Sequence, residues 1–131
     1  MNVALSTNRQ GAMLEFRDIK RFGDESGFLT VLALESGDLS ARIRFYFEPH
    51  SLKTFLGELR QMDQTLSGSA TLRPMWESPF IRLALDHRGH IAVSGELGDA
   101  DQHLRFTFDT DQTCLRPLIS DLDACLHLPA V

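Results

Sequence analysis

Residues 39–62, LSARIRFYFEPHSLKTFLGELRQM, carry the clearest structural pattern in the chain. In its first part the side chains alternate, which predicts a strand from Leu39 to Glu48 with one buried face and one open face. Pro49 ends this strand and suits the first turn of a helix. Apolar residues then recur three and four apart, which predicts an amphipathic helix to about Gln64. The members of this apolar stripe are Leu52, Phe55, Leu56, Leu59 and Met62.

Short strands are predicted on both sides of this stretch, separated by turns that contain glycine or other turn formers. They cover residues 12–18, 28–34, 70–76, 80–86, 90–97 and 104–108. A last helix is expected from Thr113 or Cys114, with an irregular start because Pro117 cannot donate a helix hydrogen bond. Hairpins combined with two helices predict an α+β fold, in which about six to seven antiparallel strands carry the helices on one face.

The chain partly repeats itself. Residues 44–48 (RFYFE) and 105–109 (RFTFD) share the pattern Arg-Phe-x-Phe-acid, and a helix follows each of them. This similarity favours a duplicated strand–strand–helix unit whose second copy carries an additional hairpin strand. The alternative is that any antiparallel strand followed by an amphipathic helix gives such a pattern.

Length and composition indicate an ordinary globular protein. With 131 residues, 43% hydrophobic and 24% charged, the chain has the size of a single domain over residues 1–131. The polar, unpatterned residues 1–11 are expected to form a flexible arm. No apolar run approaches the roughly 20 residues that span a bilayer, and no secretory signal is expected, so we predict a cytoplasmic protein. Two cysteines, Cys114 and Cys125, suit a reducing compartment and are expected to pack in the core.

The negative charge is concentrated near the C-terminus. Acidic and basic residues balance over residues 1–85, so residues 86–131 supply the whole net charge of −5. This balance disfavours nucleic-acid binding, which needs clustered Lys and Arg, and it favours a basic protein partner. The residues expected to attract such a partner are Asp99, Asp101, Asp109 and Asp111. The alternative is an acidic surface that serves solubility alone.

The sequence offers no recognisable catalytic or cofactor motif. It contains no Gly-x-Ser-x-Gly elbow, no phosphate-binding glycine loop and no Gly-x-Gly-x-x-Gly. His87, His90 and His103 lack Cys, Asp or Glu at a recognised metal-ligand spacing, and solvated turns explain them better. We therefore expect no enzyme activity, cofactor or metal.

Large side chains on open surfaces are the remaining candidates for partner binding. Arg42, Arg44 and Tyr46 share the strand face opposite the predicted core face, and these residue types are enriched in interface hot spots. Trp76, beside a loop, is a second candidate anchor. The alternatives are arginines that only solvate an open sheet face and a tryptophan that lies in the core.

The order of these segments resembles the WapI-like immunity proteins, bacterial proteins that protect a cell from a contact-delivered toxin. The resemblance runs from about residue 16 to 126 and rests on the helix after residues 44–49 (RFYFEP), on residues 89–95 (GHIAVSG) and on residues 108–113 (FDTDQT). It implies a non-catalytic cytoplasmic protein that neutralises a toxin by surface complementarity. The competing class is a structural or regulatory domain that assembles with itself, including as a homodimer.

Overall fold

Each half of the molecule folds as four antiparallel strands followed by a helix. The computed structural model describes residues 1–7, 10–23, 26–75, 79–98 and 101–131. The first sheet has the order β1-β2-β3-β4 and the second the order β5-β6-β7-β8. The first half comprises β1 (Val3–Leu5), β2 (Ala12–Arg21), β3 (Phe28–Ser36), β4 (Leu39–Phe47) and α1 (Pro49–Thr65). The second comprises β5 (Gly68–Leu72), β6 (Phe80–Leu85), β7 (His90–Gly98), β8 (His103–Asp111), the 3₁₀ helix η1 (Gln112–Cys114) and α2 (Leu115–Cys125).

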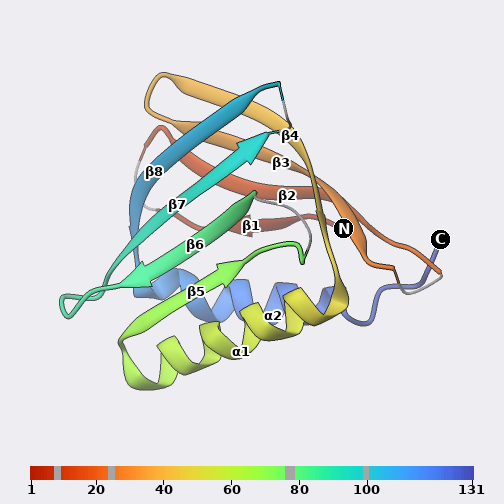
Figure 1. Cartoon of the computed structure of the whole chain (residues 1–131). Coiled ribbons are helices and arrows are strands. Elements are labelled where there is room, and N and C mark those ends of the chain that lie inside the picture. The colour runs from red at the N-terminus through yellow and green to blue at the C-terminus, as the bar shows by residue number, and fades with distance from the viewer. Residues whose placement is uncertain (8–9, 24–25, 76–78, 99–100) are drawn as a thin grey trace.

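The two sheets approach each other at β4 and β8 and diverge toward β1 and β5, where the helices lie (Figure 1). At the near end the Ser36 hydroxyl donates to the backbone carbonyl of Thr107, 3.0 Å away. At the far end each helix packs on the other half: α1 contacts β5, and α2 contacts β1. Each half therefore contributes a helix that packs on a strand of the other half.

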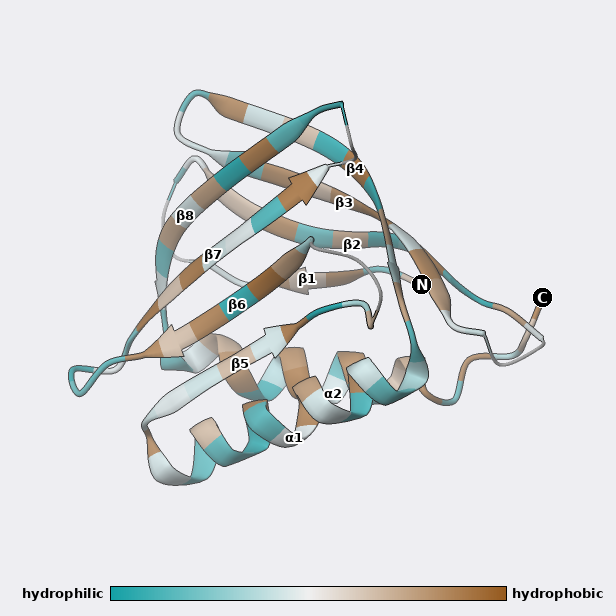
Figure 2. Cartoon of the chain, in the orientation of Figure 1, coloured by the Kyte–Doolittle hydropathy of each residue, from teal (hydrophilic) through white to brown (hydrophobic). Residues whose placement is uncertain are grey.

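The core lies between the inner faces of the two sheets and the apolar stripes of the helices. Hydropathy alternates along the strands, and apolar residues of both helices face the sheets (Figure 2). The rings of Phe28 and Phe47 stack at 5.1 Å, and Phe45 lies 6.1 Å from Phe47. Burying one such side chain stabilises the fold by about 1.5–3 kcal/mol. The buried stripe of α1 is the predicted one: Leu52, Phe55, Leu56, Leu59 and Met62.

The predicted α+β class is confirmed, with three corrections. Over the described residues the strands number eight in two sheets, not about six to seven in one. The flexible arm expected over residues 1–11 is wrong for Val3–Leu5, which pair with β2 because Val3 and Leu5 bury their side chains. Each half has four strands, so the second copy of the repeat carries no additional one. The irregular start of the last helix is confirmed, since η1 precedes α2.

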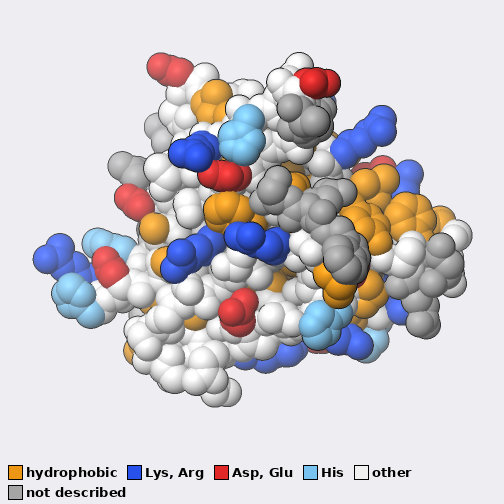
Figure 3. Space-filling model, in the orientation of Figure 1, with side chains coloured by type: hydrophobic (Ala, Val, Ile, Leu, Met, Phe, Trp, Pro, Cys, Tyr) orange, Lys and Arg blue, Asp and Glu red, His pale blue; other side chains and the backbone are white. Residues whose placement is uncertain are grey.

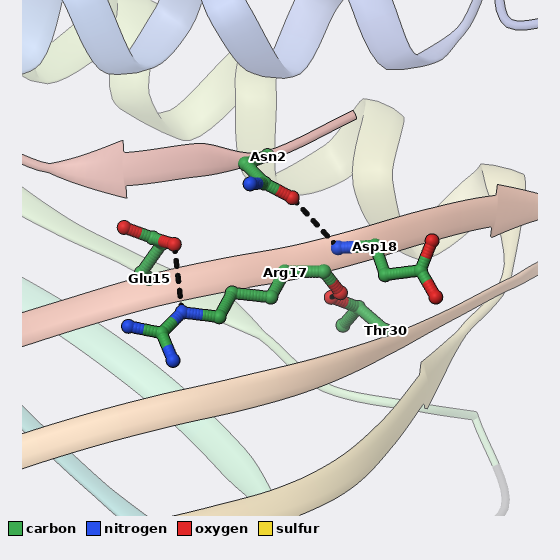
Figure 4. A network of polar contacts seen from close by, with 5 residues as sticks. All are labelled: Asn2, Glu15, Arg17, Asp18 and Thr30. Atoms are coloured by element: carbon green, nitrogen blue, oxygen red, sulfur yellow. Dashed lines mark hydrogen bonds and ion pairs between the residues drawn. The ribbon is translucent and has the colours of Figure 1, made fainter.

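A bulge in β2 fastens the N-terminal residues to the sheet (Figure 4). The register between β2 and β3 shifts between Arg17 and Lys20, and Asp18 takes a positive φ of 52°. The bulged N–H of Asp18 donates to Oδ1 of Asn2 at 2.8 Å, and the buried Thr30 hydroxyl donates to the carbonyl of Arg17 at 2.8 Å. The bulge interrupts the ladder here, so without these bonds the Asp18 N–H and the Arg17 carbonyl would lack a hydrogen-bond partner.

Candidate protein-interaction groove

A groove of about 590 Å³ opens where the two sheets separate, between β4 and the adjoining ends of β7 and β8. Figure 1 shows these ends of β7 and β8 near β4. The apolar part of its lining includes Leu97, which is buried, and Ile43 and Leu104, which are half-buried. Its polar part comprises Arg42, Arg44, Gln102 and His103, and among the residues that the structure describes no acid lines it. The lining therefore combines apolar area with the two arginines of β4.

The basic rim follows from strand alternation. Arg42 and Arg44 lie on the outer face of β4, and both are exposed. Their cross-strand neighbours on β3 are Ala33 and Val31, so no acid lies directly opposite them. Within the part of the chain that the structure describes, neither guanidinium makes an ion pair or a hydrogen bond. Unpaired arginines beside apolar area are typical of interface cores.

On the opposite side of the groove, the basic side chains of β8 lie beside a carboxylate. His103 Nε2 lies 3.5 Å from Glu96, and Arg105 Nε lies 2.8 Å from the same carboxylate. Glu96 therefore compensates positive charge on β8. Among the described lining residues, the cationic groups without an acidic partner are Arg42 and Arg44 on β4.

Tyr46 continues the row of Arg42 and Arg44 but has a local role. Its hydroxyl donates to the backbone carbonyl of Ser26 in a short hydrogen bond. Its ring lies so close to Gly27 that a Cβ there would meet Tyr46 Oη at 2.8 Å. Tyr46 is half-buried and contacts the residues that precede β3, so it does not extend the surface formed by Arg42 and Arg44.

The acidic residues expected to attract a basic partner are spread along the second sheet. Asp101 is exposed just before β8, whereas Asp109 is exposed near the far end of β8. Eight steps of about 3.3 Å separate the two ends of this strand by roughly 26 Å. Asp111 accepts a 2.9 Å hydrogen bond from the Thr113 N–H and thereby begins η1. Figure 3 shows acidic and basic side chains interspersed on the face it presents.

Two predicted interface residues, Asp99 and Trp76, lie outside the described residues. Of the predicted interface residues, the structure brings Arg42 and Arg44 together in the groove.

Reactive and metal-ligating groups do not form a site within the described residues. Nowhere in them do three His, Cys, Asp or Glu side chains come together to hold a metal ion. Burial raises the pKa of the Cys114 thiol to about 12 and that of Cys125 to about 11, so both are protonated near neutral pH. The N–H groups of Arg88 and His90 donate to Asp86 and lower its pKa, which is the effect of a hairpin turn.

Sequence reasoning missed the groove residues Ile43, Leu104 and His103. Strand alternation predicts Ile43 on the core face, opposite Arg42 and Arg44, and the other two residues belong to a strand distant in sequence. The adjoining ends of β7 and β8 reach β4 only through the packing of the two sheets, which no local pattern encodes. The duplicated Arg-Phe-x-Phe pattern was the available signal, because it marks β4 and β8 as equivalent strands.

A family model and a solved structure are similar to this chain. A family model described as "Immunity protein WapI-like family" matches residues 6–129. No curated protein matches the sequence. A solved structure described as crystal structures of trypanosoma bruciei MRP1/MRP2 aligns with a TM-score of 0.56 and 13% identity, covering 97% of this chain and 83% of that chain. At this identity the similarity shows a shared fold.

Proposed function

Because this chain belongs to the WapI-like immunity protein family, we propose that it neutralises a toxin domain by binding it and occluding its active site. The observation that carries the proposal is the match of the family model over residues 6–129. Occlusion needs a stable interface, and such interfaces bury about 1,600 Å² in total. No chemical step by this chain is part of the proposal.

The groove between β4 and the adjoining ends of β7 and β8 is the proposed centre of this interface. Apolar area at Ile43 and Leu104 supplies burial, and Arg42 and Arg44 supply directional hydrogen bonds. Such a mixture resembles the composition of known protein–protein interfaces more than it resembles a small-molecule pocket, which is more enclosed and more apolar.

The decisive experiment is protection in cells together with complex formation in vitro. A toxin domain recovered with this chain as bait from the lysate of its own organism is expressed with and without the chain in a susceptible host. We expect growth only when the chain is present, and a one-to-one complex of the purified proteins by light scattering. A toxin that kills equally in both cultures and forms no complex would contradict the function.

The net charge of −5 supports a second element of the proposal, a toxin domain that is basic overall. Opposite net charges accelerate encounter, and salt screens this effect over a Debye length of about 8 Å at physiological ionic strength. We therefore expect the association rate of the complex to fall as salt is raised. An association rate that does not change with salt would remove the electrostatic element and leave occlusion intact.

Two further elements concern where the chain acts and in what state. The free, buried thiols of Cys114 and Cys125 support residence in the reducing cytoplasm. No helix in the described part of the chain is long and apolar enough to cross a membrane. Self-assembly is the competing function, favoured by the terminal positions of β4 and β8 in their sheets. A homodimer at micromolar concentration that is lost in Arg44→Glu would support self-assembly.

A further inference from the structure

The backbone of β4 is free along the side that faces the groove. β4 is the last strand of its sheet, and among the described residues it pairs only with β3. Gly37 and Asp38 form a two-residue turn between these strands, with Gly37 at a φ of 61°. In such a hairpin the flanking residues Ser36 and Leu39 form a hydrogen-bonded pair, and pairs then alternate along the ladder.

This alternation fixes which backbone groups point outward. Ser40, Arg42 and Arg44 occupy the non-hydrogen-bonded pairs, opposite Glu35, Ala33 and Val31. Their N–H and C=O groups are therefore directed away from β3, toward the groove. The same two arginines thus present both a free backbone edge and free guanidinium groups.

We propose that the groove receives an extended acidic segment of the toxin partner, which adds to the first sheet as a strand beside β4. This inference rests on the proposed function and names the part of the partner that the chain recognises. Strand addition of this kind takes its affinity from main-chain hydrogen bonds and its specificity from alternate side chains.

The sequence pattern of the segment follows from the alternation of β4. Residues of the added strand opposite Arg42 and Arg44 share their face and are two positions apart, so both should be Asp or Glu. The residue between them lies on the other face, toward the apolar lining at Ile43, Leu97 and Leu104. The segment therefore reads acid–apolar–acid.

Charge argues against a second copy of this chain as the occupant. If two β4 strands paired edge to edge, Arg42 and Arg44 of one copy would lie beside the same residues of the other. Like charges on adjacent strands destabilise a pairing, whereas carboxylates opposite arginines form bidentate pairs.

The test uses a short soluble peptide in which three glutamates alternate with two valines, labelled for fluorescence anisotropy and titrated to millimolar concentration. Its partner is the full chain. Control peptides replace glutamate by lysine, or carry N-methyl groups on the backbone amides that would bond to β4. We expect saturable binding of the acidic peptide and loss of binding for both controls.

Variants of the chain locate the binding site. Arg42→Ala and Arg44→Ala should each weaken peptide binding about tenfold, the value of one charged hydrogen-bonded pair of about 1.4 kcal/mol. Arg82→Ala is the matched control, because Arg82 is an exposed arginine on the second sheet, outside the groove lining. Equal weakening by Arg82→Ala, unchanged binding in both β4 variants, or no saturable binding would overturn the inference.

The same variants separate this inference from the proposed function. If the toxin domain forms a complex that Arg42→Ala and Arg44→Ala leave unchanged, strand addition is wrong while toxin neutralisation stands. If the toxin domain forms no complex with the unmodified chain, the proposed function itself fails.

Discussion

β4 and β8 carry the same Arg-Phe-x-Phe pattern and occupy the same last position in their sheets, yet their arginines differ. Arg105 on β8 lies opposite Glu96 and forms an ion pair with it at 2.8 Å. Arg44 on β4 lies opposite Val31 and has no acid across the ladder. Whether a motif arginine is available to a partner is therefore decided by its cross-strand neighbour, not by the motif.

The aromatic positions of the two strands show a matching difference in the core. Phe45 lies opposite Thr30, whereas Phe106 lies opposite Gly95. In the first sheet, the buried hydroxyl of Thr30 donates to the Arg17 carbonyl at the β2 bulge. In the second sheet, Gly95 has no side chain, which leaves space for the ring of Phe106. The inward-facing phenylalanines of β4 and β8 therefore have different cross-strand neighbours.

The largest effect is expected from filling the space at Gly95. A Cβ there would lie 2.5 Å from the Phe80 carbonyl oxygen and 2.7 Å from the ring of Phe106. Since backbone must move to accommodate it, Gly95→Ala should lower the free energy of unfolding by about 3 kcal/mol, measured by urea denaturation.

Gly57→Ala is the matched control for this substitution. Gly57 lies in α1, where a Cβ would meet nothing within 4 Å. Alanine should raise the free energy of unfolding by up to about 1 kcal/mol there, through helix propensity. Two variants of equal stability would refute the role assigned to Gly95.

The next effect concerns the hydroxyl of Thr30 in the first sheet. Thr30 is buried and donates to the Arg17 carbonyl at 2.8 Å. Thr30→Val keeps the shape but leaves that carbonyl unpaired, so the free energy of unfolding should fall by about 1–2 kcal/mol. Thr107→Val, at an exposed position of β8, should change it by less than about 0.5 kcal/mol, and an equal loss in both variants would contradict this account.

A pH-dependent effect should arise from the two thiols of the second half. Burial raises the pKa of Cys114 to about 12 and of Cys125 to about 11, from an ordinary value of 9.0. The folded state therefore favours the neutral thiols, and their contribution to stability is fully present below pH 9 and is lost as pH rises toward 11 and 12. Denaturation curves at pH 8 and pH 10 measure this loss.

Thiol chemistry provides an independent check of the same burial. A disulfide reagent at pH 8 should react with both cysteines only after denaturation, because the thiolate is the reactive form. Rapid reaction of the folded chain would show that the two thiols are not enclosed as described.

The smallest effect on stability is expected from exchanging the residues opposite Arg44 and Arg105. This exchange tests directly whether the cross-strand neighbour makes each arginine available to a partner. Val31→Glu places a carboxylate opposite Arg44, as Glu96 lies opposite Arg105. An exposed pair of this kind changes the free energy of unfolding by less than about 1 kcal/mol. Binding of the acidic peptide should nevertheless fall about as far as in Arg44→Ala.

Glu96→Val is the reverse exchange and frees Arg105 on the second sheet. It should leave binding of the acidic peptide at β4 unchanged. Weaker binding in Glu96→Val, or full binding in Val31→Glu, would show that the cross-strand neighbour does not control the availability of Arg44.

Local sequence patterns predicted the elements better than their assembly. The strand at residues 39–48, the stripe from Leu52 to Met62 and the irregular start before Pro117 all followed from side-chain period and backbone chemistry. β1 was missed because three residues are too few to show a period, and its burial depends on α2, more than a hundred positions away.

The candidate site was predicted only in part. Alternation placed Arg42 and Arg44 on an open face, and this is correct. It also placed Tyr46 there, but the bond from its hydroxyl to the Ser26 carbonyl engages it locally. The attraction of a basic partner by Asp101, Asp109 and Asp111 stays a prediction; the structure spreads these residues from the start of β8 to its end, where Asp111 caps η1.

The α+β class, the faces of the strands and the repetition of Arg-Phe-x-Phe before each helix follow from local sequence patterns. The packing of α1 on β5 and of α2 on β1, and the groove between β4 and the adjoining ends of β7 and β8, depend on tertiary contacts. Period and propensity act over a few neighbouring residues, whereas cross-strand and inter-sheet contacts join residues farther apart in the chain. Whether Arg44 is free or paired depends on those distant contacts.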